Sequence, residues 1–135
     1  MAKGEKLLYQ ENKSAYGLVL GFLMLNLAIT LFVLRAMAVN AGIGVFIMYN
    51  IVLSLVGFLV AIKIKKYSMG FGVFTIILGV FHFVVNFIMT GLPASTQNPA
   101  ATLLTALASL MLAAGGIITI RKTKLRRQYL IHREP

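Results

Sequence analysis

The stretch Met69–Gly91, MGFGVFTIILGVFHFVVNFIMTG, decides the fold of this chain. Its small and polar residues recur at steps of three or four, which places them on one side of a helix. Nearly all of its other residues are Val, Ile, Leu, Phe or Met. A helix that is apolar all round apart from one such stripe is typical of a membrane, where the stripe faces other helices. The stripe consists of Gly72, Thr75, Gly79, His82, Asn86 and Thr90.

The rest of the chain has a similar composition. Of its 135 residues, 59% are hydrophobic and 12% are charged, whereas soluble chains average roughly 25% charged residues. The apolar residues form four blocks, each long enough to cross about 30 Å of hydrocarbon as a helix. We therefore expect an all-α integral membrane protein, with residues 1–135 forming a single domain. Four transmembrane helices in an antiparallel bundle are predicted at about residues 16–36, 45–62, 69–90 and 101–120.

The positive charges lie almost entirely on one side of this predicted bundle. Twelve of the thirteen Lys and Arg residues fall in the N-terminal tail, the linker between the second and third helices, and the C-terminal tail. This distribution follows the positive-inside rule and predicts that both termini are cytoplasmic. We expect a multi-pass protein of the plasma membrane, typical of a prokaryotic inner membrane. The basic tails would be short, residues 1–15 would be frayed, and the charges would face anionic lipid headgroups and not nucleic acid.

Four polar side chains fall within about two helical turns of one another in membrane depth. One interpretation is a polar pocket or pathway, with the histidine as its titratable group. The other is hydrogen bonding between helices, because hydrocarbon cannot satisfy the donors and acceptors of these side chains. We favour the second interpretation. The four residues are Asn26, Asn50, His82 and Asn86.

Small residues at helical spacing occur on all four predicted helices and let helices approach closely. The candidate packing residues are Gly17, Gly21, Ser54, Gly57, Gly72, Thr75, Gly79, Thr105, Ser109 and Ala113.

Charged residues beyond the membrane give two further candidates. Arg35, on the outer side, would extend to the interface or bind an anion or a partner subunit. The C-terminal cluster would contact lipid headgroups and fix the topology, or bind a partner. That cluster comprises Arg121, Lys122, Lys124, Arg126 and Arg127.

Catalytic and metal-binding patterns are weak in this sequence. It has no cysteine, and its three acidic residues, Glu5, Glu11 and Glu134, all lie in the tails. One membrane histidine without an orienting carboxylate is a poor basis for nucleophilic catalysis or for a metal site. We predict no enzyme activity and no cofactor. The lack of a membrane-embedded carboxylate also argues against the simplest proton-coupled exporter.

Two functions fit these features, and no stretch carries a family signature. The first is an accessory, assembly or scaffold subunit of a larger membrane complex, with other membrane subunits as partners. The second is a homo-oligomeric channel or carrier for a small solute or ion, with its polar site in the outer half of the bundle.

Overall fold

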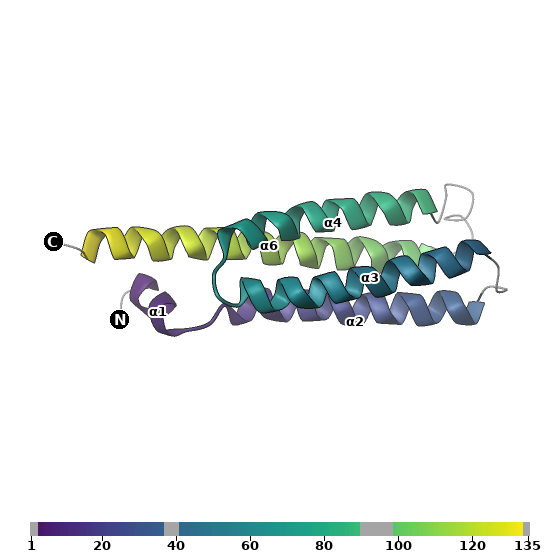
Figure 1. Cartoon of the computed structure of the whole chain (residues 1–135), viewed down its shortest axis with the longest axis horizontal. Helices are drawn as coiled ribbons and strands as arrows, with labels where there is room; N and C mark the ends of the chain where they lie inside the picture. The colour runs from purple at the N-terminus through teal and green to yellow at the C-terminus, as the bar shows by residue number, and fades with distance from the viewer. Residues whose placement is uncertain (1–2, 37–40, 90–98, 134–135) are drawn as a thin grey trace.

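The structure is a computed structural model that describes residues 3–36, 41–89 and 99–133, and every regular element in those ranges is a helix. The long helices lie side by side in one elongated bundle (Figure 1). This confirms the prediction of an all-helical chain. The helices are α1 (Lys3–Tyr9), α2 (Lys13–Ala36), α3 (Ala41–Ile64), α4 (Met69–Met89) and α6 (Pro99–Arg133).

Three of the helices are long and apolar enough to cross a membrane. The corresponding stretches are Lys13–Leu31, Gly44–Ile64 and Leu103–His132. A fourth, shorter apolar stretch, Met69–Val85, belongs to α4. These lengths are compatible with a membrane protein.

Large apolar side chains also cover the outside of the bundle. Met24, Leu55, Ile77 and Leu110, one from each long helix, are all more than half exposed. Contiguous apolar surface of this kind is unusual on a soluble monomer, whereas lipid tails would cover it.

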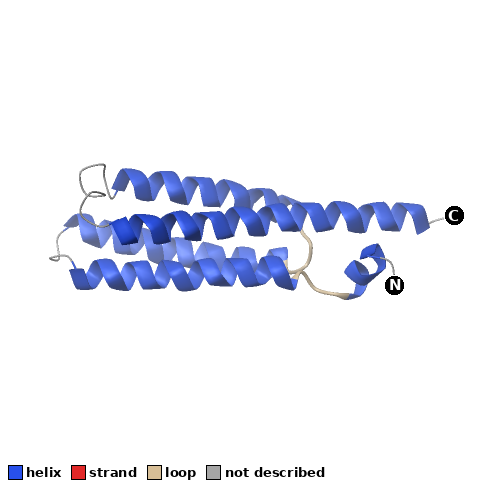
Figure 2. Ribbon diagram, turned by 180° about the vertical axis from the view of Figure 1, so that it is seen from behind, coloured by secondary structure: helices blue, strands red, loops and turns tan. Residues whose placement is uncertain are grey.

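Helix α6 organises the bundle, because it packs along both α2 and α4. Helix α3 packs mainly against α2 and makes few contacts with α4. The buried core between the helices is built from Val19, Phe22, Leu53, Leu78 and Leu112 among others. The order around the bundle is therefore α4, α6, α2 and α3, with the weakest contact between α3 and α4 (Figure 2).

The last helix is much longer than the predicted range 101–120. It runs without interruption to Arg133, so that its C-terminal part extends past the ends of the other long helices (Figures 1 and 2). The predicted range thus covers only the apolar part of α6, and the basic tail after it continues as a helix, as the spacing of Leu125, Tyr129 and His132 allows. Charged residues end the apolar run at Ile120, but Lys, Arg, Gln and Leu are all good helix formers.

The prediction of a frayed N-terminal tail is wrong for its described part. Residues 3–9 form α1, which contacts α6 and lies beside its C-terminal half (Figure 1). Asn12, between α1 and α2, is completely buried. The N-terminal segment is therefore part of the packed structure.

Candidate functional site

Asn26 connects α2 to α3 in the middle of the bundle. Its side-chain amide Nδ2 donates to the carbonyl oxygen of Asn50 at 3.2 Å and to Oγ of Ser54 at 2.8 Å. The hydroxyl of Thr30 donates to the carbonyl oxygen of Asn26 at 2.8 Å, one turn further along α2. Asn26 and Asn50, which the sequence predicts at similar depth, thus lie together. The direct contact between them joins the side chain of Asn26 to the main chain of Asn50.

Asn50 has a buried side chain with unused hydrogen-bonding capacity. It is 1% exposed, and neither its Nδ2 nor its Oδ1 has a hydrogen-bond partner. Oδ1 of Asn26 and Oγ of Ser109 are also buried without a partner. An unsatisfied polar group in hydrocarbon costs several kcal/mol. The described interior of the bundle therefore contains free donors and acceptors, one of them on Asn26 itself.

His82 lies on α4 and is enclosed by aromatic rings from two other helices. The ring of Phe22 on α2 meets the imidazole edge-on, with centroids 5.3 Å apart and an interplanar angle of 86°. The ring of Tyr49 on α3 lies nearly parallel to it, 6.3 Å between centroids, and the tyrosine hydroxyl is 3.5 Å from Nδ1. His82 is 1% exposed. It therefore links α4 to α3 across a boundary where these two helices make few contacts.

Two further predicted site residues are Asn86, the fourth member of the polar set, and Arg35, the outer-side charge. The side chains of Asn86 and Arg35 lie outside the described residues. The structure thus brings Asn26, Asn50 and His82 to one layer of the bundle through Phe22 and Tyr49, their neighbours along the helices.

Glycines of the predicted packing set bring α4 and α6 into close contact. A Cβ atom added to Gly79 would lie 3.0 Å from the carbonyl oxygen of Ser109 and 3.2 Å from the backbone nitrogen of Ala113. A Cβ atom added to Gly72 would lie 3.3 Å from the carbonyl oxygen of Gly116. No larger side chain fits between these helices without separating them. Thr75, between the two α4 glycines, is buried.

Other members of the packing set face α6, α2 or the bundle core. A Cβ atom on Gly21 would collide with the side chain of Met111, and one on Gly57 would lie 3.2 Å from the ring of Phe22. Thr105 and Ser109 of α6 are buried as well. Gly17 is the exception, because it is exposed and an added Cβ would meet nothing within 4 Å. The prediction that Gly17 packs against another helix is therefore wrong within this chain, since it lies on the outward face of α2.

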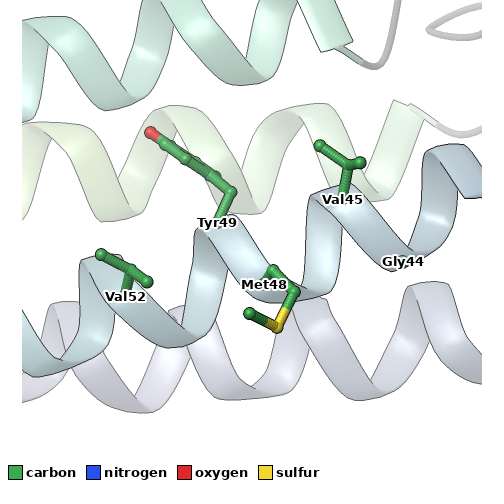
Figure 3. Close-up of a pocket in the computed structure, with 5 residues that line it drawn as sticks. All are labelled: Gly44, Val45, Met48, Tyr49 and Val52. Carbon is green, nitrogen blue, oxygen red and sulfur yellow. The ribbon is translucent and has the colours of Figure 1, made fainter.

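A shallow hollow lies on the outer side of α3. It has a volume of about 570 Å³ and is lined by Gly44, Val45, Met48, Tyr49 and Val52 (Figure 3). Its lining is almost entirely apolar, and Tyr49 supplies the one polar side chain among these five residues. In a bilayer this surface would face lipid tails.

A second polar cluster, which the sequence analysis did not predict, closes the end of the bundle that carries most of the basic residues. We call this end the basic end. Nδ2 of Asn12 donates to the carbonyl oxygen of Ile64 at 3.1 Å and to Oγ1 of Thr119 at 2.9 Å. The backbone nitrogen of Asn12 donates to the carbonyl oxygen of Lys65 at 3.1 Å. One asparagine thus joins α2, the last turn of α3, and α6.

One local signal for Asn12 was present in the sequence. Asparagine directly before an apolar helical run is a preferred N-cap residue, and the carbonyl oxygen of Asn12 does accept from the backbone nitrogen of Tyr16 at 3.1 Å. Oδ1 of its side chain has no hydrogen-bond partner, and Nδ2 donates instead to the carbonyl oxygen of Ile64 in the last turn of α3, which also accepts from the backbone nitrogen of Tyr67 at 3.1 Å. The sequence spacing could predict the cap but not this long-range contact.

Tyr67 sits in the turn after α3 and holds the basic end together. It adopts a left-handed backbone conformation with φ of 59°, which is uncommon for a bulky residue. Its hydroxyl donates to the carbonyl oxygen of Gln10 at 2.7 Å, and its own carbonyl accepts from Oγ1 of Thr123 at 3.1 Å. The guanidinium of Arg126 lies 5.3 Å from the ring centroid. Burial raises the pKa of the Tyr67 phenol, while the positive charge of Arg126 opposes that shift.

The predicted C-terminal basic cluster divides into two groups. Arg126 packs on Tyr67, and Nζ of Lys122 lies 3.4 Å from Oγ of Ser14, so both cations face the bundle. Arg121, Lys124 and Arg127 are exposed. These three residues lie within one side of the helix at steps of three. They form the outer face of the projecting part of α6.

In the described ranges, no three His, Cys, Asp or Glu residues come together in a way that could hold a metal ion. The polar contacts found there are hydrogen bonds and aromatic contacts between helices, together with the ion pair between Glu11 and Lys65 at 3.2 Å. Comparison of the chain with protein-family models, with curated proteins and with solved structures finds no match. The function must therefore be inferred from the residues of this chain.

Proposed function

We propose that this chain is a non-enzymatic membrane protein with four transmembrane helices and cytoplasmic termini, which acts as an accessory, assembly or scaffold subunit of a larger membrane complex. The observation that carries the proposal is how the buried polar side chains are used. Asn26 bonds to α3, His82 is enclosed by aromatic rings of α2 and α3, and Asn12 bonds to α3 and α6. Polar groups used in this way fix helix register.

The outer surface supports the same proposal. Besides Gly17, the small residues Ala28 and Gly44 are exposed on α2 and α3, and Gly44 has open space beside it. Small residues on a lipid-facing surface allow another helix to approach closely. The bundle thus has more helix-packing surface than it uses internally.

Native mass spectrometry of the complex extracted in a gentle detergent tests this proposal. We expect the chain to come out with at least one other membrane protein in fixed stoichiometry. A single species containing this chain alone would contradict the proposal.

A homo-oligomeric channel or carrier is the second candidate, and one specific observation favours it. The unpartnered side chain of Asn50, Oδ1 of Asn26 and Oγ of Ser109 are buried hydrogen-bonding groups that a small polar solute could use. Purified protein in liposomes would then pass a solute, and Asn50→Leu or His82→Leu would change the flux. Leu55→Ala, on the lipid-facing side of the same helix, is the matched control. Absence of flux, or flux equal in all variants, would exclude this site.

A further inference from the structure

Beyond the end of its apolar run at Ile120, α6 continues as a projecting segment, Arg121–Arg133, which we call the stalk. An α-helix rises about 1.5 Å per residue, so Lys124 lies about 6 Å and Ile131 about 16 Å beyond Ile120, the last residue of the apolar run. The headgroup layer of one leaflet is about 5–8 Å thick. The outer half of the stalk therefore extends past the headgroups, if the chain spans the membrane as proposed above.

The stalk has one covered side and one open side. The covered side contacts Tyr67 through Arg126 and lies next to α1. The open side carries Arg121, Lys124 and Arg127, all exposed, and α6 contains no acidic residue that could pair with them. The three cations are therefore available to an outside partner.

Apolar side chains accompany these cations. Ile131 is 70% exposed and Leu125 is 45% exposed, and at helical spacing both fall on the same side as the three basic residues. An exposed isoleucine beyond the headgroup layer has no lipid tail to cover it. A surface that combines cations with an exposed apolar residue matches an amphipathic segment that carries acidic residues around an apolar stripe.

We propose that the stalk is a docking surface for an acidic amphipathic helix of a partner protein on the basic side of the membrane. The proposal rests on the function proposed above and adds the chemistry of the partner. Charge complementarity selects an anionic partner. Arg127 and Ile131 lie about 10 Å and 16 Å beyond Ile120, past the headgroups, and select protein over lipid, whereas Arg121 and Lys124 lie at headgroup depth. Anionic lipid is the competing occupant that the test must exclude.

The test uses the full-length chain in nanodiscs of phosphatidylcholine, which carry no net charge. The probe is a fluorescent helical peptide with glutamates and leucines at steps of three and four, and its affinity is measured by anisotropy. Replacing Arg121, Lys124 and Arg127 together by Gln should weaken binding about tenfold, which corresponds to three exposed ion pairs of ordinary strength. Ile131→Gln alone should weaken it about threefold, through loss of apolar contact.

The matched control removes the same charge at the same end of the bundle. Lys13, Lys63 and Lys66 are exposed but lie off the stalk, and their joint replacement by Gln should change peptide affinity less than twofold. Equal losses in the two triple variants, or no binding by wild type, would overturn the proposal. One further pair of results would overturn the proposal. Vesicles with anionic lipid would bind through the stalk cations, and Ile131→Gln would change the binding of neither the peptide nor the vesicles. Lipid would then be the occupant of this surface.

A second measurement separates this proposal from the proposed function. If wild type is extracted with a stoichiometric partner, the stalk triple variant should lose that partner while the Lys13, Lys63 and Lys66 variant keeps it. A triple variant that retains its partner at wild-type stoichiometry would refute the stalk surface and leave the subunit function intact. A wild-type chain extracted alone would instead refute the subunit function.

Discussion

At the scale of single residues, Asn12 holds three helices together, although it lies in a polar segment where the sequence predicts a frayed tail. Its side chain satisfies the carbonyl of Ile64 and a hydroxyl of α6, and it is fully buried. Asn12→Ala leaves both groups without this partner. We expect the free energy of unfolding to fall by about 1–3 kcal/mol, measured by denaturant titration in detergent with circular dichroism.

Ser14→Ala is the control for this substitution, because Ser14 is exposed in the first turn of α2 and its hydroxyl lies 3.4 Å from Nζ of Lys122, in an exposed contact. Its effect should stay within about 0.5 kcal/mol. Equal stability of Asn12→Ala and wild type would show that the contacts of Asn12 are not important for the bundle.

Tyr67 leads to a prediction about pH. Burial raises the pKa of its phenol above the ordinary value of 10.0, so the folded state favours the protonated form. The resulting stabilisation is fully present below about pH 10 and is lost as the pH rises through the raised pKa. We expect the midpoint temperature of wild type to fall more steeply above pH 10 than that of Tyr67→Phe, which cannot ionise.

Tyr9→Phe is the comparison for Tyr67→Phe, since Tyr9 is exposed on α1. It should follow the wild-type curve, because it keeps Tyr67. Parallel curves for wild type and Tyr67→Phe across pH 10 would show that ionisation of Tyr67 is not coupled to folding.

How far single residues could be predicted from the sequence depended on how local their contacts are. Counting residues from the helix ends placed Asn26, Asn50 and His82 at similar depth, because the rise per residue of a helix is fixed. The aromatic partners of His82 could not be predicted, since depth alone does not give the rotation of each helix. The partners of Asn12 were missed for the same reason, as Thr119 lies 107 positions away in sequence.

At the scale of elements, the contact between α4 and α6 depends on small residues. A Cβ atom on Gly116 would lie 2.5 Å from the carbonyl oxygen of Gly72 and 3.0 Å from the backbone nitrogen of Ile76. Backbone atoms cannot move aside as a flexible side chain can. Gly116→Ala should therefore push the two helices apart and destabilise the bundle by about 1–3 kcal/mol, measured by the same denaturant titration.

Gly17→Ala is a matched control for Gly116→Ala, because it makes the same chemical change at a helical glycine with open space around it. Alanine is the better helix former, so this variant should be as stable as wild type or slightly more stable. Similar destabilisation by both variants would mean that helix packing is not the cause.

The helix boundaries show which element-scale features a sequence determines. The start of α4 at Met69 coincides with the predicted start, because the mostly polar residues 63–68 separate it from the apolar run of α3. The predicted range 101–120 ends at the last apolar residue of α6, because a change from apolar to basic residues marks where a membrane ends and not where a helix ends. Gly17 shows a related difficulty, since a small residue on a helix can face either the bundle or the lipid.

At the scale of the whole molecule, the proposed topology places the basic end in the cytoplasm. A fluorescent protein or phosphatase joined after Pro135 reports the side on which the C-terminus lies. We expect the fluorescent protein to fold and the phosphatase to stay inactive, because the linker and both tails carry twelve of the thirteen basic residues.

The same phosphatase inserted within residues 91–98 should be active. That segment connects the end of α4 to the start of α6, at the end of the bundle that lies away from the basic end. Phosphatase activity at both positions, or at neither, would contradict a chain with four crossings. The shorter apolar stretch of α4 makes this a real test of whether that helix crosses the membrane.

The uninterrupted run of α6 has a mechanical consequence. Between Ala100 and Arg133 it contains no proline that would kink it, so one continuous helix runs from the apolar core of the bundle into the stalk. Near its midpoint the hydroxyl of Thr119 accepts from Nδ2 of Asn12, and the hydroxyl of Thr123 donates to the carbonyl oxygen of Tyr67. A force applied to the stalk would therefore reach these two contacts before it reached the face of α6 that packs against Gly79.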